Sequence, residues 1–247
     1  MSYSEIHFHI LDGVDDGPGT LDESVELARL ALADGTRTIV ATPHVHRRHV
    51  TDPAEISDRV ARLNDRLRQE RVPVDVLAGG ELAHDMVGRL DQRRLDAIAQ
   101  GPHGRRWVLL EAAFEGLEQS YTQAADELRE RGFAVVVAHP ERAAQSRRTQ
   151  EVLAHELAEG SALQLTAWSL TGRYGDAIRA LALRLLRSTA VAVIASDAHG
   201  VHRAPSLGPA LTAVAAVGEA NPARFAGTKP RALLNRGLAI PTAARAA

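Results

Sequence analysis

The strongest constraint on the fold is an alternation of short apolar runs with longer helical patterns, which recurs seven times along the 247 residues. The short runs are continuous or rich in β-branched residues, as is typical of strands covered on both faces. Alternating strands and helices form a parallel sheet with right-handed crossovers, either open or closed into a barrel. The expected strands are Ile6–Ile10, Thr38–Ala41, Val74–Ala78, Trp107–Leu110, Ala134–Ala138, Ala162–Leu165 and Val191–Ala195.

The longer patterns between these runs have helical spacing. Leu21–Ala33 is the clearest, because Thr20 precedes it as an N-cap and Glu23 completes a capping box. Further helices are expected over Ala54–Glu70, Tyr121–Arg131, Gln150–Glu159, Asp176–Arg187 and Pro209–Glu219. No linker interrupts the alternation, so we expect a single domain over residues 1–247.

Composition excludes several classes of function. The chain has no cysteine, which rules out disulfides, thiolate metal sites and a cysteine nucleophile. Its one lysine, Lys229, lies late in the chain beside a proline, which does not suit a P-loop or carboxylated lysine. A net charge of −2 offers no basic surface to nucleic acid. Without a leader or a run of ~18 apolar residues, we expect a cytoplasmic protein with no membrane insertion.

Six of the seven apolar runs are followed by a histidine, aspartate or glutamate. These residues are His7 and His9, His44, Glu81, Glu111, His139, and Asp197 with His199. In an α/β barrel the C-terminal ends of the strands converge on one pocket. The sixth run, which ends in Leu165-Thr166-Ala167-Trp168, has no such residue.

These donors are nitrogen and oxygen atoms, which suit Mn, Fe, Zn or Mg rather than a thiolate zinc site. In His7-Phe8-His9 the pleat of a strand points both imidazoles to one face. Seven or more donors exceed the needs of one ion, so the sequence predicts two or three ions.

Each motif alone has an ordinary explanation. An HxH or DxH pair often arises by chance, and a lone glutamate usually caps a helix or faces solvent. Asp16 lies in a loop of Asp, Gly and Pro, which either forms a turn or reaches an ion. His46 and His49 lie in a basic tract that we expect to face solvent or substrate. The coincidence of six strand ends at one level favours the metal site.

The ordered set of motifs resembles the PHP (polymerase and histidinol phosphatase) superfamily. Within it, the chain looks like the bacterial protein-tyrosine phosphatases of the CpsB/YwqE type, which accompany capsule and exopolysaccharide synthesis. The similar segments are Ile6–Leu11, Val14–Gly17, Arg37–His44, Gly80–Glu81, Leu110–Glu111, Val137–Arg142 and Ile194–His199.

The resemblance implies a distorted (β/α)7 TIM-like barrel, the PHP fold, with a manganese centre of two or three ions; iron or zinc are alternatives. The implied ligands are His7, His9, Asp16, His44, Glu81, Glu111, His139, Asp197 and His199. Arg142 and Arg203 would contact the substrate phosphate, and His199 would act as ligand, general acid or both. The implied partner is a phosphotyrosyl protein, a cognate bacterial tyrosine kinase.

The chain departs from the family pattern at three positions. Glu5 stands where the family often has aspartate, Val45 where it often has a second histidine, and Ala112 where an aromatic residue commonly follows the strand-four glutamate. The last two positions bear on the rim of the site and so on the substrate.

Three alternatives stay open at this point. One is a small-metabolite phosphatase such as a histidinol phosphatase. Another is an amidohydrolase, although that class commonly needs a carboxylated lysine where this chain has Glu111. The third is a catalytically silent regulatory binding module.

Overall fold

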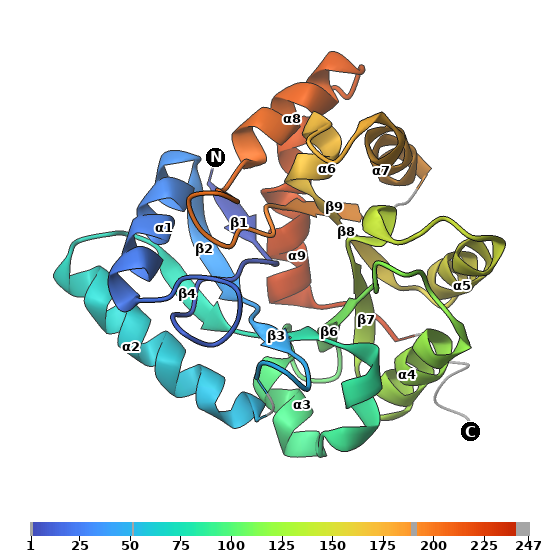
Figure 1. Ribbon diagram of the computed structural model, residues 1–247, viewed down its shortest axis with the longest axis horizontal. Coiled ribbons are helices and arrows are strands. Elements are labelled where there is room, and N and C mark those ends of the chain that lie inside the picture. The colour runs from blue at the N-terminus through green and yellow to red at the C-terminus, as the bar shows by residue number, and fades with distance from the viewer. Residues whose placement is uncertain (1, 51, 189–191, 241–247) are drawn as a thin grey trace.

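The computed structural model describes residues 2–50, 52–188 and 192–240. Parallel strands form a ring, and helices surround that ring (Figure 1). The strands are β1 (Tyr3–Glu5), β2 (Thr36–Ala41), β3 (His44–Val45), β4 (Asp75–Ala78), β5 (Glu81–Leu82), β6 (Trp107–Glu111), β7 (Ala134–Ala138), β8 (Ala162–Thr166) and β9 (Ala192–Ala195). The helices are α1 (Leu21–Ala33), α2 (Ile56–Gln69), α3 (Gln92–Ile98), α4 (Gln119–Glu130), α5 (Arg147–Ala158), α6 (Ala167–Thr171), α7 (Asp176–Ser188), α8 (Leu207–Ala216) and α9 (Thr228–Arg236). Short 3-10 helices are η1 (Pro53–Glu55), η2 (His84–Arg89), η3 (Pro140–Arg142) and η4 (Pro222–Phe225).

The nine strands of the described ranges occupy seven positions around a barrel. One sheet has the order β1-β2-β4 and the other the order β3-β5-β6-β7-β8-β9. β3 continues the path of β2, and β5 continues that of β4, so each pair counts as one interrupted strand. The ring closes where Phe8 bridges Ala198 in parallel and the amide of His9 donates to the Ala198 carbonyl at 2.9 Å. The predicted distorted (β/α)7 barrel is confirmed.

The interruption between β4 and β5 consists of two glycines. A Cβ on Gly79 would lie 2.5 Å from Cγ1 of Val40, and one on Gly80 would lie 2.8 Å from Cγ2 of Val45. Any larger residue would therefore push the neighbouring strand away. The close approach keeps β5, and with it Glu81, inside the ring.

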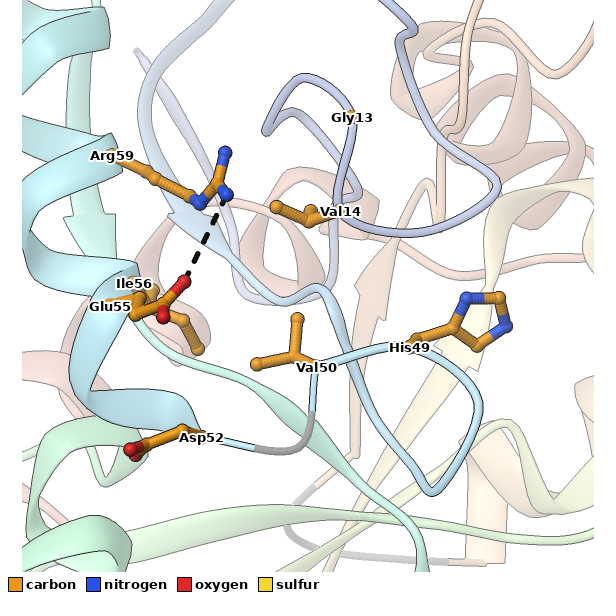
Figure 2. A pocket seen from close by; sticks show the side chains of 8 residues that line it. All are labelled: Gly13, Val14, His49, Val50, Asp52, Glu55, Ile56 and Arg59. Carbon is orange, nitrogen blue, oxygen red and sulfur yellow. Dashed lines mark ion pairs between the residues drawn. The ribbon is translucent and has the colours of Figure 1, made fainter.

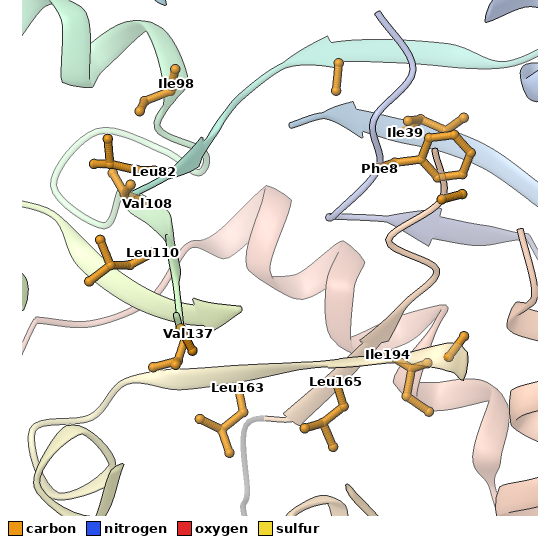
Figure 3. Packing of buried hydrophobic residues seen from close by; sticks show 14 of the residues in the cluster. Phe8, Ile39, Leu82, Ile98, Val108, Leu110, Val137, Leu163, Leu165 and Ile194 are labelled. Carbon is orange, nitrogen blue, oxygen red and sulfur yellow. The ribbon is translucent and has the colours of Figure 1, made fainter. Parts of the chain in front are cut away.

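Strand side chains pack on both faces of the ring. Val108 and Leu110 of β6, like Leu163 and Leu165 of β8, point outward into the layer between strands and helices (Figure 3). A second apolar cluster lies on the inner face and includes Trp107 at the start of β6. The helix α9, which crosses behind the centre of the ring in Figure 1, closes the end where the strands begin, and its Leu233 carbonyl accepts from Nε1 of Trp107 at 3.0 Å. The opposite end, where the strands finish, is left for polar residues.

The expected helices are all present, with ends that shift by a few residues. The expected strand Ile6–Ile10 is wrong in extent: the regular strand is Tyr3–Glu5, and Ile6–Ile10 is a buried irregular segment. The reason is that its backbone pairs with loops, as when the Phe8 carbonyl accepts from the Thr42 amide at 2.9 Å. Val191, the expected start of the last strand, lies outside the described residues. The short helices α3, α6 and α9 were not expected from the sequence.

None of the helices in the described ranges is long and apolar enough to cross a membrane. The assignment of residues 1–247 to a single domain stays a prediction.

Candidate metal centre

All nine candidate ligands meet at the end of the barrel where the strands finish. Their donor atoms form four overlapping groups, each with all atoms within 4.8 Å of one another. The groups are His9 with Asp16, His44 and His199; His7 with His139 and Asp197; His7 with His9 and Glu81; and His44 with Glu81 and Glu111. Overlap of this kind is typical of a cluster whose ions share ligands.

Glu81 lies at the centre of the cluster. Its Oε2 atom is 2.9 Å from Nδ1 of His44, 3.3 Å from Nε2 of His7 and 3.4 Å from Nε2 of His9. Oε2 is buried. Although these nitrogens are close, none of its contacts within the described part of the chain has the geometry of a hydrogen bond. Three imidazole nitrogens and a carboxylate oxygen gathered around one point fit a bound cation.

Two imidazoles are held by residues behind them. Oε1 of Gln164 accepts from the backbone amide of His139 at 3.1 Å and lies 2.8 Å from Nδ1 of His7. Because a backbone amide can only donate, that side-chain atom is the oxygen, and Nδ1 of His7 carries the proton. Nδ1 of His9 lies 2.7 Å from Oδ2 of Asp15. Both histidines thus turn Nε2 toward the cluster, where the two Nε2 atoms lie 3.2 Å apart.

His199 is oriented in the same way. Its Nδ1 lies 3.0 Å from the carbonyl oxygen of Asp197, so Nε2 is left to face Oδ1 of Asp16 at 3.3 Å. Burial and a neighbouring imidazole lower the pKa of His199 to about 4. A neutral ring with a free nitrogen suits a metal ligand.

The carboxylates draw positive charge into the cluster. Burial opposes the charged form of His44, but Asp16 and Glu81 outweigh it and raise its pKa to about 11. Burial, together with the charge of Glu81, raises the pKa of Glu111 to about 7. The raised pKa values mean that both groups hold a proton that offsets the negative charge of the carboxylates. A bound cation would supply that positive charge instead, because metal binding releases protons from its ligands.

Two candidate ligands have strained backbones. His139 directly after β7 has a φ of 36°, and Asp197 beyond β9 has a φ of 52°. Non-glycine residues in this region cost on the order of 1–3 kcal/mol, and they cluster at functional sites. The buried Glu5 carboxyl accepts a hydrogen bond from the Ser196 amide at 2.8 Å and so helps to hold the turn that carries Asp197.

Two arginines border the cluster. Nη1 of Arg142 lies 2.7 Å from Oδ2 of Asp197, and Arg203 donates to the same oxygen. Each guanidinium has donors beyond those that contact Asp197. Their role at a substrate phosphate stays a prediction.

A cavity of about 590 Å³ opens beside the cluster. Its lining includes Asp16, Pro18, His199, Val201 and Arg203. Figure 2 shows a second, smaller cavity of about 190 Å³, with His49 on one side and the ion pair of Arg59 with Glu55 on the other.

The exposed His49 ring stacks on His44 with 5.5 Å between centroids, and His46 lies 6.2 Å from His49. The expectation that these two histidines face solvent or substrate stays a prediction.

Sequence reasoning missed two residues that hold the ligands. Asp15 lies in the motif Val14–Gly17, for which only Asp16 is a predicted ligand, yet Asp15 is the residue that contacts His9. Gln164 is the one polar residue in the predicted run Ala162–Leu165, which belongs to β8, the strand whose end has no histidine or carboxylate. A polar side chain inside a buried strand was the signal that could have found it.

The donor set fits a metal cluster on its own chemistry. It contains nitrogen and oxygen atoms and no sulfur. Oε2 of Glu81 and Nδ1 of His139 are buried without a hydrogen bond in the described ranges, which is costly unless another partner binds them. The ligand roles of the nine residues are a proposal that this geometry supports.

Comparisons with known proteins find relatives over most of the chain. The family model described as "Capsular polysaccharide synthesis, CpsB/CapC" matches residues 3–235. The chain is 36% identical over 199 residues to the tyrosine-protein phosphatase YwqE of Bacillus subtilis, covering 80% of this chain and 77% of that protein. It is 31% identical over 205 residues to the putative tyrosine-protein phosphatase CapC of Staphylococcus aureus, covering 81% and 78%.

Solved structures give the same result. A structure from work on YwqE of Bacillus subtilis and CpsB of Streptococcus pneumoniae, described there as unique metal-dependent tyrosine phosphatases, superposes with a TM-score of 0.80 at 32% identity over 96% of each chain. The phosphotriesterase homology protein of Escherichia coli superposes with a TM-score of 0.61 at 12% identity, covering 91% of this chain and 95% of that one, which shows the barrel alone.

Proposed function

The chain belongs to the CpsB/CapC family of capsular polysaccharide synthesis, and from this premise we propose that it is a metal-dependent protein-tyrosine phosphatase. The observation that carries the proposal is the convergence of nitrogen and oxygen donors from the strand ends beside Arg142 and Arg203. Hydrolysis of a phosphomonoester needs fixed positive charge around the phosphoryl oxygens, which this arrangement provides.

The cofactor is proposed to be two or three manganese ions. The proposed ligands are His7, His9, Asp16, His44, Glu81, Glu111, His139, Asp197 and His199. When bound, such ions lower the pKa of coordinated water toward ~7 and offset the negative charge of the phosphoryl group. Mixed imidazole and carboxylate donors also accept iron or zinc, so the metal needs direct measurement.

The arginines bind and orient the substrate. A guanidinium presents paired donors that match two phosphoryl oxygens, which a lysine ammonium does not. Arg142 and Arg203 approach Asp197 from two loops, so a phosphate at the mouth would lie between them and the cluster. The leaving group of phosphotyrosine is a phenolate with a pKa near ~10, which needs less protonation than the alkoxide of serine.

The physiological substrate is proposed to be phosphotyrosine on a cognate bacterial tyrosine kinase linked to capsule or exopolysaccharide synthesis. Relatives are named tyrosine-protein phosphatases, and the family is described by capsular polysaccharide synthesis. A cytoplasmic location stays a prediction from the sequence.

Two other functions are distinguishable from this one. A silent binding module would keep buried carboxylates such as Glu81 without a cation, at a large cost in stability. A metabolite phosphatase would use the same cluster on a smaller substrate.

The deciding assay compares kcat/KM for a phosphotyrosyl peptide, a phosphoseryl peptide and histidinol phosphate at one manganese concentration. We expect the phosphotyrosyl peptide to be preferred, with the Glu81→Gln variant as the control for contaminating phosphatases. A preference of about a hundred-fold for histidinol phosphate, equal to ~2.7 kcal/mol, would overturn the tyrosine-phosphatase proposal and leave the metal site intact.

A further inference from the structure

Five side chains beside the metal centre form a row in which aromatic rings and guanidinium groups stack on one another. Cζ of Arg142 lies 4.6 Å from the ring centroid of Phe114 and 4.6 Å from that of Tyr174, so the guanidinium is held between two rings. Tyr174 lies 5.9 Å from Trp168, and Arg173 covers Trp168 at 4.1 Å. Each contact is within the range of a cation–π or aromatic pair.

The row comes from three neighbouring loops. Phe114 follows β6, Arg142 lies in η3 after β7, and Trp168 begins the segment after β8 that leads to Tyr174. These strands are adjacent in the sheet (Figure 1). The end of β8, which offers no candidate ligand, therefore supplies Trp168 and Tyr174 to this row.

Phe114 differs from the other members of the row in its exposure. Its side chain is 51% exposed. Among the described residues, the exposed large hydrophobic side chains are Leu77, Phe114 and Val201, and of these Phe114 alone is aromatic. At the same time its ring lies 5.8 Å from the ring of His139, a candidate ligand. Phe114 thus lies beside the cluster and exposes an apolar surface to solvent.

We infer that Phe114 is the specificity residue that receives the aromatic ring of the substrate, while Arg142 holds its phosphate. The inference rests on the proposed function and names how that site selects an aryl ester. In phosphotyrosine one oxygen joins the ring to the phosphoryl group. A site for it must therefore place an apolar surface that contacts the ring next to a cationic group that binds the phosphate. Phe114 and Arg142 are in direct contact and meet that need.

The stack also explains why Phe114 and not Tyr174 takes the ring. Tyr174 is half-buried and is backed by Trp168, so its role is to close the other face of the Arg142 guanidinium. Arg142 is fixed on both faces and bound to Asp197 at its edge. The free apolar surface of the row is on Phe114.

The test measures binding by calorimetry, because binding does not depend on turnover. Benzylphosphonate carries a ring and a phosphonate, and methylphosphonate carries the phosphonate alone. Both are titrated into the manganese-loaded wild type and into Phe114→Leu, Phe114→Trp and Leu77→Ala. Leu77 is an exposed apolar residue on β4 and is not part of the row.

Phe114→Leu is expected to raise the Kd for benzylphosphonate about five- to tenfold and to leave that for methylphosphonate within about twofold, since the ring contact is the part removed. Phe114→Trp should retain most of the aryl preference, and Leu77→Ala should match wild type. Unchanged affinity for both ligands, or a parallel loss for both, would overturn the inference, because the second result assigns Phe114 to positioning Arg142. Failure of the wild type to hydrolyse any phosphotyrosyl peptide would instead overturn the proposed function.

Discussion

The side-chain oxygen of Gln164 lies 2.8 Å from Nδ1 of His7, across 157 residues of sequence. This contact places the His7 proton on Nδ1 and leaves Nε2 for the cluster. Replacing Gln164 with leucine removes the acceptor, so metal affinity should fall about 10- to 100-fold, as is usual when the residue behind a metal-binding histidine is lost. Gln164→Glu keeps an acceptor for His7 and is the matched control. Equal metal affinity of the leucine variant and wild type, measured by competition with a chelating dye, would remove Gln164 from the site.

Glu81 should be needed for the whole cluster, because its carboxylate approaches three imidazoles at once. Glu81→Gln is expected to lose bound metal and activity together. The exposed Glu115 on the nearby loop is the control, and Glu115→Gln should keep both. Elemental analysis beside a p-nitrophenyl phosphate assay checks this. Wild-type metal content in the Glu81 variant would show that the cluster is centred elsewhere.

Arg142 should act on the substrate rather than on the ions. Arg142→Lys keeps a charge but loses the paired donors, so kcat/KM should fall about tenfold or more, as a charged hydrogen bond contributes ~1.5–3 kcal/mol. Metal content should not change. The exposed Arg148 offers the control Arg148→Lys. An unchanged rate for Arg142→Lys would assign Arg142 a role outside catalysis.

A buried ion pair outside the site sets a separate test of stability. Arg129 of α4 is buried and donates to Glu156 of α5 and, at 2.9 Å, to Ser161. Arg129→Met leaves the buried Glu156 carboxylate without its cation, so unfolding free energy should fall by roughly 3–5 kcal/mol and Tm by about 10 °C. The double variant Arg129→Met with Glu156→Leu should recover most of the loss. Thermal unfolding of all three proteins measures this, and a double variant no better than the single one would contradict it.

The barrel and the level of the site follow from local patterns in the sequence. Seven alternations of strand and helix predict parallel strands, and parallel strands place their C-terminal ends together wherever the helices begin and end. For that reason the candidate ligands could be chosen from strand ends, even though the first strand was placed several residues too late. His7 and His9 still share one face, with 3.2 Å between their Nε2 atoms.

What escaped the sequence depends on contacts between distant segments. Gln164 touches His7 only because β8 lies near the chain that closes the ring. Position 112 holds alanine where the family commonly has an aromatic residue, and the ring that contacts Arg142 is that of Phe114, two positions later in an irregular loop. Neither relationship has a spacing rule from which it could be predicted.

The central claim is that the strand ends hold a catalytic metal cluster, and metal stoichiometry tests it most directly. Protein purified without chelator should contain two or three ions per chain by elemental analysis. Prolonged chelation should remove the ions and the phosphatase activity, and manganese should restore both. Less than one ion per chain in protein with full activity would contradict the account.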